Sequence, residues 1–397
     1  MTFFIARDEQ NSRKKLMEEK ICAIALNRIF GFNPAAGNAL VSNFGSAEAV
    51  FGAGEERLQD ALRGRPELTA AILTEDLAAD RAELDKLYDQ GLDFIPVTSS
   101  DYPSLLKECN DPPLGLYYRS GSPPHMVFET RPAVAIVGTR NMTPYGKYWC
   151  TDIVKALAAA ARKPVIVSGM AYGTDFTAHS AALGCGLPTI GVLPTGIDDV
   201  YPIRHEPLAR RMDETPGCAL VTDYPPGTNP LAINFIRRNR IIAGLSSAVI
   251  LTESKIKGGG MITMRFAADY FRDVFALPGR VDDICSQGCN LLIRNKLAEP
   301  ITDLEDLVSK LGLGFNSRSR ASFREAVELK CASVDPDHAD TIIDMAMTIK
   351  RERGISLNSL TERTGRSFSE VASDAALLET WGLISIDLLQ RCSANSV

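Results

Sequence analysis

At residues 133–140 the chain reads Ala133-Val134-Ala135-Ile136-Val137-Gly138-Thr139-Arg140, five apolar residues followed by a glycine turn and a cation. Five further apolar runs follow, at 164–167, 189–193, 219–221, 248–251 and 274–277. Such short, continuously apolar, β-rich runs are typical of strands buried on both faces of a parallel sheet. Helical segments are expected between them, at 146–161, 175–184, 208–213, 239–245 and 261–270. The alternation predicts an α/β fold, an extended Rossmann-like, doubly wound and mostly parallel sheet.

Three other regions surround this predicted domain, which we place at residues 93–311. Residues 1–92 are rich in Ala, Leu and Glu at helical spacing and predict a small helical domain of the SAM or helix-hairpin-helix type. Its candidate hairpin, at 29–34, is better explained as a structural connection between helices than as a phosphate-binding hairpin. Residues 312–337 are predicted as a linker, and residues 338–397 as a winged-helix-like domain with helices, a glycine turn and a short strand.

Composition excludes several classes of protein. The chain has 397 residues, of which 45% are hydrophobic and 23% charged, so a largely disordered protein is excluded. No apolar run reaches the roughly 18 residues that a membrane span needs, and the amino terminus lacks the basic start of a secretory signal. We therefore expect a cytoplasmic protein without a membrane partner. The nine scattered cysteines and four histidines show no ligand spacing, so no metal and no cofactor are predicted.

The net charge of −6 conceals an asymmetry along the chain. Residues 131–298 hold 19 Lys and Arg against 13 Asp and Glu, a surplus of +6, so the remainder carries −12. A chance fluctuation would explain this difference. A basic domain with an anionic partner, flanked by acidic domains, explains it as well.

Candidate ligand-binding residues follow the predicted strands, because ligands of open α/β sheets bind where strand carboxyl ends meet helix amino termini. The turn at 138–141 carries one guanidinium, and the turn at 168–175 offers hydroxyls and close backbone approach. After 248–251, three glycines open a helix, a geometry that binds anions, with two lysines beside it. The predicted phosphate contacts are Gly138, Arg140, Ser168, Gly169, Lys255, Lys257, Gly259 and Thr263.

An arginine cluster provides the second part of the predicted site. Guanidinium groups bind phosphate oxygens, and an aromatic face stacks on an unpaired base. The cluster precedes the apolar run 241–245, which places it at a predicted helix start, where cations oppose the helix dipole unless an anion compensates. A solvated helix face is the simpler alternative. The cluster adds Phe235, Arg237, Arg238, Asn239 and Arg240 to the predicted DNA-binding set.

Catalytic residues are not predicted. His179 follows Asp175 by four residues, which would place both on one helix face. No Ser or Cys nucleophile motif accompanies the pair, so a structural hydrogen bond explains it better than catalysis.

Together these motifs resemble the DprA/Smf family (DNA-processing protein A). The similarity is collinear over about 98–298, with departures at Asp223, Ile236, Gly258, Gly260 and Lys296. It is carried by Tyr102-Pro103, 111–117, 136–140, Tyr145-Gly146, 168–175, Ala178-His179, Gly196, Tyr201-Pro202, 224–227, Phe235, 238–246, Gly259, Ile262-Thr263, 277–279 and 288–290.

The resemblance implies a single-stranded DNA-binding protein without catalytic activity. It implies a recombination mediator that protects incoming DNA and loads RecA during natural transformation. It also implies a homodimer, which we place near Leu291, Leu292 and Ile293 because these residues are apolar. Ordinary core residues are the alternative explanation for the same three.

Two alternatives remain open. A nucleotide-processing enzyme of the lysine-decarboxylase-like phosphoribohydrolase type would use the same fold, but its P-G-G-x-G-T-x-x-E signature is absent. A regulator that reads duplex DNA through the C-terminal domain would need a basic recognition helix. The candidate helix, 367–378, has Glu370 and Asp374 and no Lys or Arg, which favours protein interaction for that domain.

Overall fold

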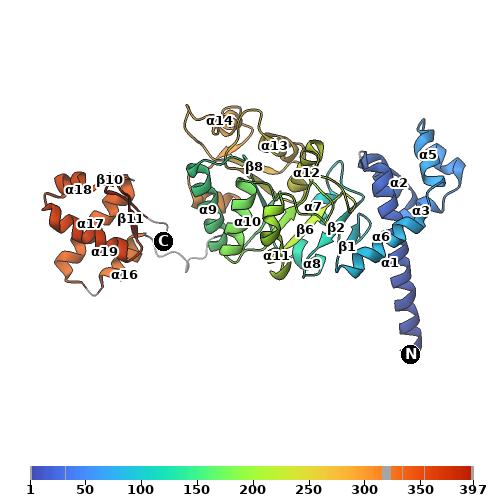
Figure 1. Ribbon diagram of the computed structural model, residues 1–397, viewed down its shortest axis with the longest axis horizontal. Coiled ribbons are helices and arrows are strands. Elements are labelled where there is room, and N and C mark those ends of the chain that lie inside the picture. Colours follow the sequence, from blue (N-terminus) through green and yellow to red (C-terminus); the bar gives the residue numbers. More distant parts are fainter. Residues whose placement is uncertain (1, 32, 315–322, 333, 353, 395–397) are drawn as a thin grey trace. The chain divides into compact units, whose positions relative to one another are not determined.

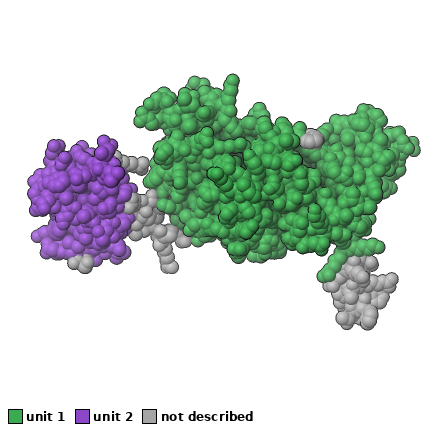
Figure 2. Space-filling view, in the orientation of Figure 1, with its two compact units in different colours: residues 1–315 green, residues 316–397 purple. Residues whose placement is uncertain are grey.

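The computed structural model describes residues 2–31, 33–314, 323–332, 334–352 and 354–394. They form two compact units, residues 1–315 and 316–397 (Figure 2). Unit 1 is built on a nine-stranded sheet of order β1-β2-β6-β5-β4-β3-β7-β8-β9, in which only β2 opposes its neighbours (Figure 1). The prediction of an α/β fold with a mostly parallel sheet is confirmed. The strands are β1 (Asp93–Pro96), β2 (Gly115–Arg119), β3 (Ala133–Val137), β4 (Val165–Ser168), β5 (Thr189–Val192), β6 (Ala219–Thr222), β7 (Ala248–Leu251), β8 (Asp273–Ala276) and β9 (Glu299–Pro300).

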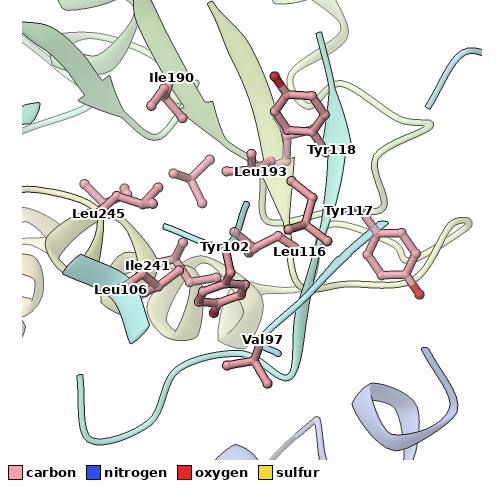
Figure 3. Close-up of a cluster of buried hydrophobic side chains, with 14 of the residues drawn as sticks. Val97, Tyr102, Leu106, Leu116, Tyr117, Tyr118, Ile190, Leu193, Ile241 and Leu245 are labelled. Carbon is pink, nitrogen blue, oxygen red and sulfur yellow. The ribbon is translucent and has the colours of Figure 1, made fainter. Parts of the chain in front are cut away.

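Helices cover both faces of the sheet because its central strands are apolar on both faces. Val134 and Ile136 pack into a cluster with α9, α10 and α15, whereas Ala135 and Val137 pack into the cluster that contains α12 and α13. Figure 3 shows part of the second cluster, where Ile241 and Leu245 lie beside Leu106. These helices are α7 (Ser104–Lys107), α8 (Pro124–Phe128), α9 (Pro144–Ala159), α10 (Thr174–Gly184), α11 (Glu206–Glu214), α12 (Ala232–Gly244), α13 (Gly259–Asp269), α14 (Gln287–Arg294) and α15 (Leu304–Lys310), with the 3-10 turn η1 (Ile203–His205).

The strand order reverses at β3. From β3 the chain moves through β4, β5 and β6 in one direction, and then returns to β7, β8 and β9 on the other side. The carboxyl ends of β3 and β7 are therefore neighbours, with Val137 opposite Leu251. Such a reversal opens a crevice at the carboxyl edge of a sheet, which is where ligands of this fold class bind.

The N-terminal helical region packs against the edge of the sheet that β1 and β2 form. Buried residues of the long helix α1, such as Ile24 and Leu26, belong to the same core as Phe94 of β1. Asn27 also donates a hydrogen bond of 2.8 Å to the carbonyl of Asp223, after β6. The helices are α1 (Thr2–Phe30), α2 (Pro34–Phe44), α3 (Ala47–Phe51), α4 (Glu55–Ala61), α5 (Pro66–Leu73) and α6 (Leu77–Asp89); Phe32, in the predicted hairpin, lies outside the described residues.

Unit 2 is a small helical body with a three-stranded antiparallel sheet of order β10-β12-β11. Its core joins the helices through Val327, Ile342, Leu360 and Leu378, all of which are buried. Of the predicted linker 312–337, residues 315–322 and 333 lie outside the described residues, and α16 occupies most of the rest. The elements are α16 (Phe323–Cys331), α17 (Pro336–Glu352), β10 (Ile355–Ser356), α18 (Leu357–Thr364), α19 (Phe368–Thr380), β11 (Ile384–Ile386) and β12 (Arg391–Ala394).

One helix boundary was wrong in a way that affects the site. The sequence predicts a helix from Asn239, with the arginines at its start, but α12 begins at Ala232. The arginines therefore lie in the middle of the helix, and Arg238 and Arg240 face the interior. The apolar spacing did not predict the start of α12 because Arg238 and Arg240 occupy positions on its buried face, where apolar residues are expected. The helix-dipole reason for expecting an anion beside them no longer applies.

Candidate nucleic-acid interface

A cleft of about 490 Å³ lies at the point where the strand order reverses. The loops after β3, β4 and β7 and the first turns of α12 and α13 form its walls. Of the thirteen predicted contact residues, eight line this cleft: Gly138, Arg140, Phe235, Arg238, Asn239, Lys255, Gly259 and Thr263. Residues more than a hundred positions apart in the sequence are thus brought to one cavity.

Arg140 is an exposed cation of the cleft. Its guanidinium carbon lies 4.5 Å from the centre of the Phe235 ring, and that ring meets Tyr201 edge-on at 5.7 Å. Among the described residues no carboxylate pairs with the Arg140 guanidinium, so its donors face the cleft. An arginine stacked on an aromatic ring is oriented while its hydrogen-bonding edge stays available for a phosphate.

The first turn of α13 lines the same cleft. Gly258 caps the helix, and Gly259 and Gly260 are its first residues. A Cβ on Gly260 would lie 3.3 Å from the Cα of Gly138, so the missing side chain lets the helix approach the β3 loop. The first amide groups of a helix have no partners within it and point along its axis with the positive end of the dipole. With the exposed Lys255 beside them, they form an anion-binding surface.

Arg238 lies at the floor of the cleft and is 3% exposed. Its Nη1 donates to the carbonyls of Gly169 and Val192, and its Nε donates to Asn239 at 3.2 Å. Burial lowers the pKa of Arg238 to about 10, against the opposing attraction of Asp175, so the group stays charged near neutrality. Arg238 therefore holds the loops after β4 and β5 together and adds positive field, with part of its hydrogen-bonding capacity already used.

Asp175 is a cleft residue that the sequence did not assign to the site. It is 8% exposed, and its Oδ2 accepts the amide of Ala171 at 3.2 Å. Burial raises the pKa of Asp175, although the Arg238 guanidinium opposes the shift. A carboxyl group at the floor of a cationic cleft makes the charge of the cleft depend on pH.

Arg240 lies away from the cleft and is structural. Its Nη2 donates to Asp223 Oδ2 at 2.6 Å, and its Nη1 donates to the Asp111 carbonyl. Burial lowers the pKa of Arg240, but the charges of Asp223 and Asp111 outweigh that effect and raise it. These bonds join α12 to the loops after β6 and before β2, and so fix the helix that carries Phe235.

The remaining predicted residues do not line the cleft. Ser168 is buried and donates to the Ile136 carbonyl at 2.7 Å. Gly169 contributes its carbonyl to Arg238, while Arg237 and Lys257 are not among the residues that line the cleft. His179 is fully buried, its Nδ1 pairs with Thr189 at 2.6 Å rather than with Asp175, and burial lowers its pKa to about 3. A neutral histidine in the core agrees with its structural interpretation.

Glu253 is another residue that the sequence left without a role. It is fully buried at the end of β7 and accepts the Thr143 amide at 2.9 Å and the Thr143 hydroxyl. A Cβ at Gly146 would collide with it. The carboxylate thus caps the start of α9 and ties that helix to the rim of the cleft, since the next residue, Ser254, lines it. An acidic residue directly after a buried strand was the available signal.

Residues 93–312, more than half of the chain, match the family model described as "DNA recombination-mediator protein A". The chain belongs to the DprA/Smf family. The resemblance expected from the motifs is confirmed, and the family is one of DNA recombination mediators.

Relatives in the DprA/Smf family show how far the similarity extends. Protein Smf of Synechocystis sp. is 40% identical over 220 residues, 55% of this chain and 54% of that protein. DNA processing protein DprA of Bacillus subtilis is 35% identical over 252 residues, 62% of this chain and 82% of that protein. The X-ray structure of DNA processing protein A from Streptococcus pneumoniae matches with a TM-score of 0.64 and 29% identity, over 73% of this chain and 97% of that chain. The similarity therefore includes the region that builds the cleft.

Proposed function

We propose that this DprA/Smf protein binds single-stranded DNA in the cleft at the β3/β7 reversal and acts as a recombination mediator. In this proposal it protects incoming DNA and loads RecA during natural transformation. The observation that carries the proposal is the exposed Arg140 guanidinium, stacked on Phe235 in a cleft that the glycine start of α13 also lines.

The chemistry of the cleft suits a sugar-phosphate backbone with unpaired bases. Helix amide groups, Arg140 and Lys255 bind phosphate oxygens without reading sequence. Phe235 and Tyr201 offer aromatic surface to a base, which is accessible only in a single strand. No element of the cleft projects as a rigid rod into a major groove, which is what duplex readers require. We therefore expect preference for single strands and little choice of sequence.

A titration of the full-length chain with labelled single- and double-stranded DNA at several salt concentrations tests this proposal. Three to five phosphate contacts predict a slope of log K against log salt of roughly −2 to −3.5, because each contact in a single strand contributes about −0.7. Tighter duplex binding, or affinity that does not change with salt, would refute it.

The mediator role needs a separate measurement, because a protein that only coats DNA would compete with RecA. We expect the chain to accelerate RecA filament formation on strands coated beforehand with a single-strand-binding protein. Arg140→Ala should lose this effect together with DNA binding. A chain that binds DNA but leaves filament formation unchanged would overturn the mediator role and leave the binding role intact.

A homodimer is the third part of the proposal, and one surface supports it. Phe271 follows the C-cap of α13, is 95% exposed and has a φ of 55°, a left-handed conformation that favours glycine. A hollow of about 540 Å³ near it is lined by Val274, Ile293, Lys296 and Leu297, and Leu297 is 56% exposed. Of the three residues expected at the interface, Leu292 is in the core and Ile293 lines this hollow.

A protruding ring and a hollow on one surface are what a twofold interface requires, since each copy then supplies both parts. Two clefts in one particle would also hold one strand at two points and raise the effective concentration. Light scattering at micromolar concentration should give a dimer for the wild type and a monomer for Phe271→Asp. Leu388→Asp, at an equally exposed residue of unit 2, is the control and should remain a dimer. A monomeric wild type would refute the proposal.

A further inference from the structure

Three aromatic side chains gather on the first two turns of α9, outside the cleft. Trp149 is partly buried and packs against the core, while Tyr145 and Tyr148 are 42% and 50% exposed. Tyr148 meets Trp149 at 5.5 Å with an interplanar angle of 87°, and Tyr145 meets it at 6.3 Å and 62°. We call Tyr145, Tyr148 and Trp149 the α9 platform.

The platform is held at both ends, and its Tyr148 ring is half exposed. Trp149 is anchored in the core, and the Tyr145 hydroxyl donates to the Pro278 carbonyl at 2.6 Å, which ties the other end to the loop after β8. Half-exposed rings contribute less to the core than buried ones, so folding alone explains this cluster poorly.

Two links connect the platform to the cleft. Along the chain, Tyr145 follows the cleft residue Arg140 by five positions. Across the fold, the Glu253 carboxylate accepts the amide of Thr143 at the start of α9, and the next residue, Ser254, lines the cleft. From Arg140 to Tyr148 the chain can span at most about 20 Å, from the extended and helical rises per residue. A fully stacked strand rises about 3.4 Å per nucleotide, so this span corresponds to at most about six nucleotides, and to fewer for an extended strand.

The charge beside the platform suits a nucleic-acid strand. Lys147 is exposed on the same turn, and no carboxylate within the described part of the chain pairs with it. The surplus of positive charge over 131–298 includes this segment. Aromatic faces next to an exposed ammonium form the combination by which proteins bind single strands without sequence preference.

We infer that the α9 platform is a second single-strand subsite, on which Tyr148 stacks a base of the strand that leaves the cleft. The inference rests on the proposed function, because the strand must first occupy the cleft. Its occupant is an unpaired base, and Lys147 contacts the adjoining phosphate. The footprint of one protomer then extends beyond the cleft along the start of α9.

Affinity as a function of oligonucleotide length tests the inference in the full-length chain. Labelled oligothymidylates of about 3 nucleotides are too short to span from Arg140 to Tyr148, whereas those of about 12 reach both, given the span above. Wild-type affinity should rise between these lengths. Tyr148→Ala and Tyr148→Leu should each lose about 5- to 100-fold for the long strand and little for the short one, the effect of one stacked base. Because Tyr148 is half exposed, both variants should fold.

Phe368→Ala is the matched control, because it removes a ring of 43% exposure from unit 2. It should leave both affinities as in the wild type. Equal affinities of wild type and Tyr148→Ala for the long strand would overturn the platform and leave cleft binding intact. If Tyr148→Leu kept the rise in affinity from the short to the long strand, stacking of a base on the Tyr148 ring would be refuted. Equal losses for short and long strands would also refute a separate subsite, and failure of the wild type to bind any strand would refute the proposed function itself.

Discussion

Arg140→Ala removes an exposed cation of the cleft and leaves the buried framework untouched. In the free protein the guanidinium lies 4.5 Å from the centre of the Phe235 ring, an interaction that contributes about 0.5–1 kcal/mol at an exposed site. The free energy of unfolding should therefore fall by no more than about 1 kcal/mol, and the melting temperature by about 2–4 °C.

Binding of DNA should change much more. A charge-assisted hydrogen bond to a phosphate contributes about 1–3 kcal/mol, so the dissociation constant for a single strand should rise about 5- to 150-fold. Loss of one phosphate contact should also make the salt slope shallower by about 0.7. Fluorescence polarisation across a salt series measures both quantities, and thermal unfolding of the same sample measures stability.

Arg57→Ala is the matched control for this experiment. Arg57 also stacks on a phenylalanine, with its guanidinium 5.0 Å from the Phe44 ring, but it lies in the N-terminal helical region outside the cleft. It should leave affinity and salt slope unchanged. An equal loss of affinity in both variants, or a loss of stability in Arg140→Ala as large as its loss of affinity, would refute the assignment of Arg140.

Three further outcomes are expected. Arg238→Ala should lower the free energy of unfolding by about 3–5 kcal/mol in denaturant titrations. The substitution removes the donor to the carbonyls of Gly169 and Val192 and the positive charge beside the buried Asp175. A fully stable variant would contradict the structural role of Arg238. Wild-type affinity for single strands should increase as pH falls, because burial raises the pKa of Asp175 and its protonation makes the cleft more positive. Asp175→Asn should bind more tightly near neutrality with a flatter pH profile, and an unchanged profile in polarisation assays would exclude this carboxyl. Burial lowers the pKa of His179 from 6.5 to about 3, so below pH 6.5 the unfolded chain takes up a proton that the folded chain does not. The free energy of unfolding should therefore fall by up to about 1.4 kcal/mol per pH unit as pH decreases. His179→Gln should remove this part of the slope in unfolding experiments between about pH 5 and 7.

Strand positions were predictable because each buried strand has its own local signal. The predicted run 133–137 is β3 itself, and 248–251 is β7. An unbroken series of β-branched and apolar residues is compatible with burial on both faces, and the glycine turns after the runs mark the edge where ligands gather. The cleft was therefore expected at the correct edge of the sheet, with Arg140 and the glycine start of α13 in it.

The orientation of the arginines in α12 could not be predicted in this way. Arg237, Arg238 and Arg240 are alike in the sequence, yet Arg238 holds the floor of the cleft and Arg240 pairs with Asp223. Each of these contacts joins residues far apart in the chain, 69 positions for Arg238 to Gly169 and 17 for Arg240 to Asp223. A local pattern contains no information about which distant carbonyl or carboxylate will lie next to a given side chain.

The sequence by itself determined the α/β alternation, the family and the edge of the sheet that carries the glycine turns. Only the tertiary structure decided which cations remain exposed, that Asp175 lies on the floor of the cleft, and that Tyr145, Tyr148 and Trp149 form an open cluster beside it. The physical reason is that strands and turns depend mainly on neighbouring residues, whereas the burial and pairing of a charge depend on the whole chain. A buried guanidinium is stable only where the fold supplies acceptors for it.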